Sequence, residues 1–137
     1  MTMEERQDFA CRYTAAWCSQ DPAKVASFFS ANGSLKVNDG APAVGRDAIA
    51  ETAHSFMAAF PDLLVIMDGL LEEGDRTVYQ WTLIGTNTGT RGGGKKVRIS
   101  GFEQWRMGED GLIAESQGQF DSADYQRQLE HGALEQS

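Results

Sequence analysis

Hydrophobic residues follow a helical spacing before Pro61 and a strand-like pattern after it, and this change constrains the fold more than any other feature of the chain. Residues 3–19 carry Phe9, Tyr13 and Trp17 one helical turn apart, which makes one apolar stripe. After Pro61, segments rich in β-branched and aromatic residues alternate with glycine-containing turns. Helices first and antiparallel strands afterwards favour an α+β fold.

Two further helices are expected before Pro61. The later of the two is expected to end at this proline. Asp21 is a suitable N-cap and Pro22 suits the first helical position, so a short helix is predicted to begin there. Its buried face is predicted to be Val25, Phe28 and Phe29, and it is expected to end at Asn32-Gly33. The next helix covers about 47–59.

The remaining segments read as strands. A short strand is expected over 34–38, followed by a loop over 39–45 that contains two glycines and a proline. The C-terminal half then predicts a four-strand antiparallel meander and a short terminal helix. The expected strands are 63–72, 77–88, 97–107 and 112–121, and the helix is 124–129.

Composition narrows the functional classes. The 137 residues suit a single domain spanning 1–137, and 41% hydrophobic residues are enough for a core. The net charge of −8 argues against a nucleic-acid partner, since only Arg91, Lys95, Lys96 and Arg98 form a basic cluster. Neither a signal peptide nor a membrane-spanning apolar run is recognised, so no membrane partner and a cytoplasmic location are expected.

Two apparent chemical motifs are rejected. The segment 89–96 nearly spells a phosphate-binding loop, but Lys96 replaces the Ser or Thr that would reach magnesium, and the segment leads into a predicted strand. His54 and His131 are the only histidines and lie far apart, and no metal-ligand spacing is present. We therefore expect no metal. Cys11 and Cys18 are expected to be reduced and at least half-buried.

Several short motifs carry a family resemblance over nearly the whole chain. Residues 81–89, WTLIGTNTG, resemble the W-x-x-x-G-T-H-T-G strand motif of the SnoaL-like polyketide cyclase family. Four other segments resemble further motifs of the family and stand in the family's order along the chain. They are Val44–Ile49, Phe60-Pro61-Asp62, Gly101–Arg106 with Asp110–Glu115, and Asp121 with Gln128-Leu129.

The resemblance implies a nuclear-transport-factor-2-like (NTF2-like) conical fold, with helices and a curved antiparallel sheet enclosing a pocket at the wide end. It also implies frequent homodimers and an aldol-type ring closure without metal or organic cofactor. In the family a histidine on the penultimate strand and an aspartate on the last strand do the acid–base work. Here the matching positions are Glu103 and Gly118, while Asn87 and Ser116 stand where many members have further histidines.

Glu103 is the first candidate catalytic residue. Side chains alternate along a strand, so Gly101, Glu103 and Trp105 share one face, and a carboxylate in an apolar cavity suits acid–base work near neutral pH. The alternative is a solvent-facing or ion-paired Glu103. Asp121 is the second candidate, as a base at the mouth of the cavity, and its alternative is to cap the terminal helix.

A small hydrophobic or aromatic ligand is expected in the pocket. Tyr13, Trp17 and Asn38 are candidate hydrogen-bond donors to a developing enolate. The apolar candidates for the lining are Phe56, Phe60, Trp81, Trp105 and Phe120. The alternative for Tyr13, Trp17 and most of these aromatic residues is a position in the core without a ligand.

Three functional hypotheses remain open. The first is a cofactor-free cyclase or isomerase acting on a polyketide-like or other cyclic carbonyl compound. The second is a non-catalytic ligand-binding or dimerisation module, and the third is a relative of epoxide hydrolases, for which no Asp-Arg-Asp arrangement is found. A C2 homodimer through the sheet is also expected, with Val97, Ile99 and Phe102 covered by the second copy.

Overall fold

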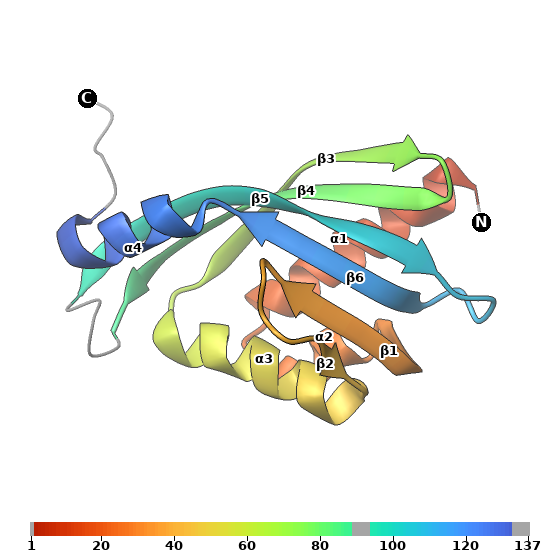
Figure 1. The fold of residues 1–137 in the computed structure, drawn as a ribbon, viewed down its shortest axis with the longest axis horizontal. Helices are drawn as coiled ribbons and strands as arrows, with labels where there is room; N and C mark the ends of the chain where they lie inside the picture. Colours follow the sequence, from red (N-terminus) through yellow and green to blue (C-terminus); the bar gives the residue numbers. More distant parts are fainter. Residues whose placement is uncertain (1, 89–93, 133–137) are drawn as a thin grey trace.

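Four helices and one curved six-stranded sheet make up the described part of the chain, residues 2–88 and 94–132 of a computed structural model (Figure 1). The strand order is β2-β1-β6-β5-β4-β3, with β1 parallel to β6 and all other pairs antiparallel. The predicted α+β class and meander are confirmed. The elements are α1 (Met3–Cys18), α2 (Pro22–Ala26), β1 (Phe29–Val37), β2 (Ala43–Val44), α3 (Arg46–Ala59), β3 (Leu64–Glu73), β4 (Arg76–Asn87), β5 (Lys95–Met107), β6 (Ile113–Phe120) and α4 (Ser122–His131).

Side-chain caps fix the starts of three helices. Thr2 and Glu5 form a reciprocal capping box at α1, a signal that sequence reasoning overlooked. The predicted cap of α2 is confirmed, because the Asp21 carboxylate accepts from the Ala23 amide at 3.0 Å and Pro22 is the first helical residue. Asp121 caps α4 by accepting from the Asp124 amide at 3.0 Å.

The second helix is shorter than predicted. It ends at Ala26, and Phe29 begins β1 instead of lying on a helix face. The Ile113 amide donates to the Phe28 carbonyl at 2.9 Å, so pairing with β6 outweighs the local helical pattern. A Cβ at Gly33 would lie 2.9 Å from the Ile113 carbonyl, so this glycine permits an irregular close approach of β1 to β6.

The loop predicted over 39–45 contains the short strand β2, which pairs with Ser34 and Leu35. The terminal helix is also longer than expected. The prediction for Cys11 is wrong because this residue is exposed, whereas Cys18 is half-buried as expected. Residues 89–93 of the rejected phosphate-loop motif lie outside the described residues, and Lys95 opens strand β5.

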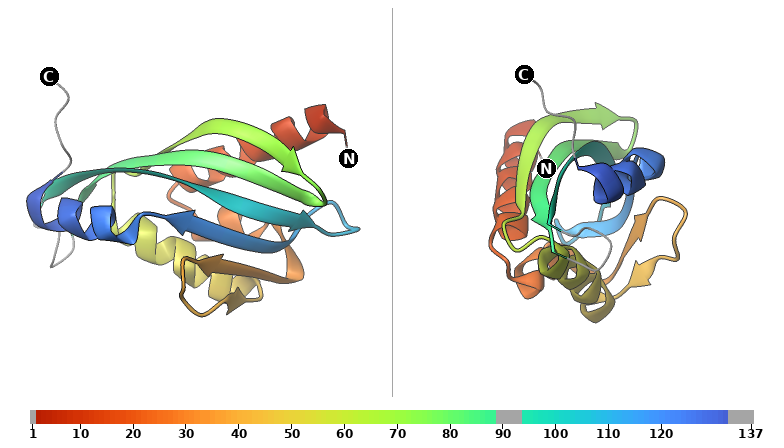
Figure 2. Two further views of the ribbon diagram at one scale, coloured as in Figure 1. Left: turned by 45° about the horizontal axis from the view of Figure 1, so that its top comes forward. Right: turned by 90° about the vertical axis from the view of Figure 1, so that its left-hand side faces the viewer.

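Curvature of the sheet creates an inner face. The register of β3 against β4 shifts between Met67 and Gly69, which is the position of a bulge, and bulges increase bending. The right-hand view of Figure 2 shows the sheet curling, with α1 and α3 completing the wall. Phe9 and Tyr13 of α1 and Ile49 of α3 pack in one core with the inward strand residues.

Two motifs of the family resemblance meet in space. The Asp62 carboxylate accepts from the Thr86 amide at 2.7 Å and from the Thr86 hydroxyl at 2.9 Å. A Cβ at Gly85 would lie 3.0 Å from the Phe60 ring, so only glycine leaves that ring its place without a shift. The Phe-Pro-Asp and Gly-Thr pieces therefore tie the end of α3 to β4, and their role in this chain is structural.

The amide side chain of Gln128 joins helix α4 to β5 by hydrogen bonds, beside the buried Leu129. Gln128 accepts from the Arg98 backbone amide at 2.6 Å and donates to the Arg98 carbonyl at 2.9 Å. Strand β6 pairs with β5 only from Gly101 onward, so Gln128 takes the place of a neighbouring strand at Arg98. Among the described residues, no helix is long and apolar enough to cross a membrane.

Candidate functional site

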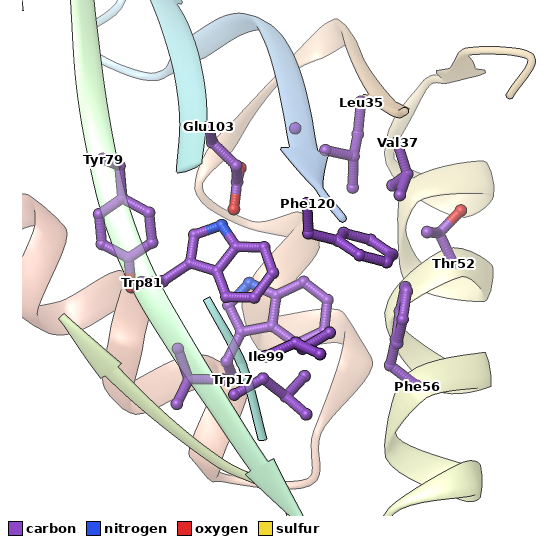
Figure 3. A pocket seen from close by; sticks show the side chains of 13 residues that line it. Trp17, Leu35, Val37, Thr52, Phe56, Tyr79, Trp81, Ile99, Glu103 and Phe120 are labelled. Carbon is purple, nitrogen blue, oxygen red and sulfur yellow. The ribbon is translucent and has the colours of Figure 1, made fainter. Parts of the chain in front are cut away.

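A mostly apolar pocket lies between the inner face of the sheet and helices α1 and α3 (Figure 3). Its deep part includes the buried side chains of Leu35, Tyr79 and Glu103. Half-buried side chains such as Trp81 and Phe120 lie nearer the solvent. The lining consists of Trp17, Leu35, Val37, Thr52, Phe56, Val65, Tyr79, Trp81, Leu83, Ile99, Glu103, Gly118 and Phe120.

Glu103 is the acidic residue of this described lining, and only 7% of its surface is exposed. The predicted strand alternation is confirmed, since Gly101, Glu103 and Trp105 share the inner face of β5. Glu103 pairs with Tyr79 of β4 on one side and with Gly118 of β6 on the other. The glycine leaves the carboxylate uncovered on that side.

The two carboxylate oxygens of Glu103 have different surroundings. Oε1 accepts from the Ser116 hydroxyl at 2.7 Å, the Trp105 indole nitrogen at 3.1 Å and the Tyr13 hydroxyl at 3.0 Å. Oε2 is 3.2 Å from the same Tyr13 hydroxyl, which has a single proton to share between both oxygens. Oε2 therefore keeps free acceptor capacity.

Burial determines the titration of Glu103. Desolvation raises the pKa of its carboxyl above the ordinary value, while the hydrogen bonds from Ser116, Trp105 and Tyr13 oppose that rise. All three donors are neutral, and no cation forms an ion pair with Glu103 within residues 2–88 and 94–132. Such a carboxyl can exchange its proton closer to neutral pH than an exposed one.

Two tyrosines near Glu103 stay protonated at neutral pH. Burial and the Glu103 charge raise the pKa of Tyr13. Burial also raises the pKa of Tyr79, whose hydroxyl bonds to Thr14 and whose ring stacks on Trp105 at 4.9 Å. Tyr13 and Tyr79 are thus hydrogen-bond donors rather than bases.

Trp81 and Phe120 form one wall of the pocket, with ring centroids 6.1 Å apart and planes at 66°. Gly101 makes this wall possible, because a Cβ there would lie 2.8 Å from the Trp81 ring and 2.2 Å from the Gln119 carbonyl. The Trp81 indole nitrogen has no hydrogen-bond acceptor in the described part of the chain.

The structure separates the candidate residues into three groups. Glu103, Trp17, Phe56, Trp81 and Phe120 belong to the lining of the pocket. A second group, Tyr13 and Trp105, lies behind Glu103 and donates to its carboxylate.

The third group lies outside the pocket lining and has structural contacts. Phe60 is fully buried at the end of α3. The side-chain oxygen of Asn38 accepts a hydrogen bond from the Phe120 backbone amide at 2.9 Å. Asp121 is an exposed helix cap, so the capping alternative is confirmed and the carboxylate is not part of the lining.

Sequence reasoning overlooked Tyr79 and Thr52 in the lining. Alternation along β4 contains the signal for Tyr79, because it stands two residues before Trp81 and so shares its face. Helical spacing contains the signal for Thr52, because it stands one turn before Phe56 and so shares its face of α3. No three His, Cys, Asp or Glu side chains gather at a possible metal site in residues 2–88 and 94–132.

Comparisons with known proteins agree with this architecture. The family model described as SnoaL-like polyketide cyclase matches residues 7–129. No curated protein matches the chain.

Solved structures share the fold at low sequence identity. TsrD from Streptomyces laurentii is 23% identical with a TM-score of 0.80, over 98% of this chain and 99% of that one. An NTF2-like protein from Burkholderia pseudomallei is 17% identical with a TM-score of 0.77, over 93% and 97%. A protein with a ketosteroid isomerase-like fold from Catenulispora acidiphila, in complex with trimethylamine, is 19% identical with a TM-score of 0.70, over 81% and 83%.

Proposed function

Because the chain belongs to the SnoaL-like polyketide cyclase family, we propose that it is an enzyme that transfers a proton on a small cyclic or polyketide-like carbonyl compound, with Glu103 as the base. One observation carries the proposal. A buried carboxylate without a cationic partner in the described residues lines an apolar pocket, with Oε1 held by Ser116, Trp105 and Tyr13 and Oε2 in contact with the Tyr13 hydroxyl alone.

Burying such a carboxylate costs free energy of folding, so its presence in a pocket points to a use. An ionised carboxylate loses its hydration on burial, and neutral donors replace only part of it. Here Ser116 and Trp105 donate to one oxygen only and Tyr13 contacts both, which fixes the orientation of the carboxylate. This arrangement supports a base held ready for substrate.

The proposed step is enolisation. Glu103 Oε2 removes a proton from the carbon beside the substrate carbonyl, the electron pair of the C–H bond becomes the C=C bond of the enolate, and the carbonyl oxygen takes the negative charge. The neutral acid then returns its proton to the same or another carbon, which restores the carboxylate. One group serves as base and then as acid.

A ring closure that needs a second acid–base residue is less well supported. Apart from Glu103, the titratable residue in the described lining is Tyr79, whose raised pKa keeps it protonated. Gly118 stands where the family resemblance places an aspartate. Single-base isomerisation or proton exchange therefore fits this pocket better than a two-residue aldol mechanism.

The missing second group also favours one alternative, a non-catalytic ligand-binding module. In that case Glu103 would serve as a hydrogen-bond acceptor that orients a ligand and would transfer no proton. The two functions differ in whether substrate protons exchange with solvent.

Deuterium exchange at C1 of 2-tetralone, followed by ¹H NMR in D₂O, tests the proposal. The wild-type chain is expected to accelerate exchange, and Glu103→Gln to reduce that acceleration roughly 100-fold, the usual contribution of a positioned base, while 2-tetralone still binds. Glu109→Gln, an exposed acid in the turn after β5, is the matched control. Binding of 2-tetralone without exchange above the buffer rate would support the binding module instead.

A further inference from the structure

Trp81 presents an unused hydrogen-bond donor to the same pocket. Its indole nitrogen has no acceptor among the described residues, although the residue is half-buried and lines the cavity. Most buried indole N–H groups find a partner. Trp105 does so here, because its indole nitrogen donates to Glu103.

Strand register brings this donor to Glu103. Trp81 pairs with Gly101 and Tyr79 pairs with Glu103, so Trp81 and Glu103 are diagonal neighbours on the inner face of adjacent strands. Diagonal neighbours of this kind are within reach of large aromatic side chains. Figure 3 shows the Glu103 carboxylate and the indole nitrogen of Trp81 turned toward each other in the cavity.

The orientation of the indole is fixed by its surroundings. The Phe120 ring meets it nearly edge-on at 6.1 Å, and the absent side chain of Gly101 leaves the space that the ring occupies. A donor held in place before a ligand arrives costs little reorganisation on binding.

We propose that the Trp81 indole N–H binds the ligand's oxygen while Glu103 Oε2 faces a proton on that oxygen or on the carbon next to it. This inference rests on the proposed function and specifies its substrate class, an aromatic-fused cyclic ketone or the corresponding enol. Because both groups enter the same cavity from diagonal positions of adjacent strands, an enol or phenol oxygen, which both accepts and donates, is the ligand group that suits the pair. In the enolisation step, Trp81 stabilises the oxygen that gains negative charge.

Three naphthalene probes separate the two contacts by isothermal titration calorimetry at pH 7. 2-Naphthol can accept from Trp81 and donate to Glu103, 2-methoxynaphthalene can only accept, and naphthalene does neither. The measured quantity is the affinity of each oxygen-bearing probe relative to naphthalene. Because all three probes share the naphthalene rings, a loss of ring packing in a tryptophan variant lowers all three affinities alike and cancels in this ratio.

Trp81→Phe is expected to lower the relative affinity of 2-methoxynaphthalene about three- to tenfold, the range of one neutral hydrogen bond. Glu103→Gln is expected to leave that ratio unchanged and to lower the ratio for 2-naphthol. The affinity of 2-methoxynaphthalene relative to naphthalene can be measured in the wild type and in Glu103→Gln alone. The inference can therefore still fail if the Trp81→Phe chain folds poorly.

Two results would overturn the inference. A wild-type chain that prefers neither oxygen-bearing probe over naphthalene has no donor available to ligands. Ratios that respond to Glu103→Gln but not to Trp81→Phe would reject Trp81 and leave the proposed role of Glu103 standing.

Discussion

Replacing Tyr13 with phenylalanine tests the electrostatic account of Glu103 directly. The substitution removes one hydroxyl and retains the ring, which lies 5.2 Å from Trp105 and 5.5 Å from Tyr79 between centroids. It therefore removes one of the three donors to Glu103 and leaves the aromatic packing in place.

The expected loss of stability depends on the charge of Glu103. A hydrogen bond to an ionised group contributes about 1.5–3 kcal/mol, and one to a neutral group contributes about 0.5–1.5 kcal/mol. Tyr13→Phe should thus cost about 1.5–3 kcal/mol where Glu103 is ionised and about 1 kcal/mol where it is neutral.

The sign of the pH dependence follows from the raised pKa of Glu103. An acid whose pKa is raised by folding binds more protons in the folded state, so the folded chain loses stability as the pH rises from the unfolded value through the folded one. Removing the Tyr13 hydrogen bond, which lowers that pKa, raises the pKa further. The stability curves of wild type and Tyr13→Phe should lie closest at acidic pH and diverge above the folded pKa.

Urea denaturation of the wild type and the variant across pH 4–8 measures the difference. Tyr125→Phe is the matched control, because Tyr125 is half-buried and packs on Phe120 at 5.5 Å. In a Glu103→Gln background the cost of Tyr13→Phe should fall to the neutral range at every pH. A cost that is the same at pH 4 and pH 8 would refute the idea that Tyr13 stabilises an ionised Glu103.

Two remaining predictions concern the glycines of the pocket and the assembly of the chain. Gly101→Ala should destabilise by about 1–3 kcal/mol in urea denaturation, because its Cβ would lie 2.2 Å from a carbonyl oxygen, whereas Gly118→Ala should fold normally because its nearest contacts are 3.5 Å away. If both variants lost the same stability, the packing argument would fail. We also expect a C2 homodimer through the outer face of the sheet, where Leu64 and Ile66 are 47% and 41% exposed. Sedimentation of a monomer at micromolar concentration would contradict it.

The sequence predicted the elements better than their pairing. The helical spacing of apolar residues, the breaker Pro61 and strand alternation are local signals, and they located α1, α3, the meander and the shared face of Glu103 and Trp105. The parallel pairing of β1 with β6 depends on residues far apart in the chain, so the strand was predicted only over 34–38 and its start at Phe29 was missed. Val97 and Ile99 were expected on an outer face that a second copy covers, but they are 1% and 4% exposed within the chain itself, and Ile99 lines the pocket.

The candidate site shows the same division. Alternation from Glu103 locates an inward carboxylate, but it does not reveal which oxygen the donors occupy. That depends on Tyr13 in α1 and Ser116 in β6, which only the tertiary structure brings together. Trp105 shares the face of Glu103 and is nevertheless excluded from the pocket, because Phe9 and Tyr13 of α1 pack against its ring.

The docking of Gln128 on Arg98 has a consequence for how the chain behaves when its C-terminus is shortened. Beyond the reach of β6, the backbone amide and carbonyl of Arg98 are occupied by this one side chain. A chain that ends before α4 would present that stretch of β5 to other molecules as an open edge, and open edges promote intermolecular strand pairing. Shortened chains should therefore aggregate during expression even though every residue of the pocket is still present.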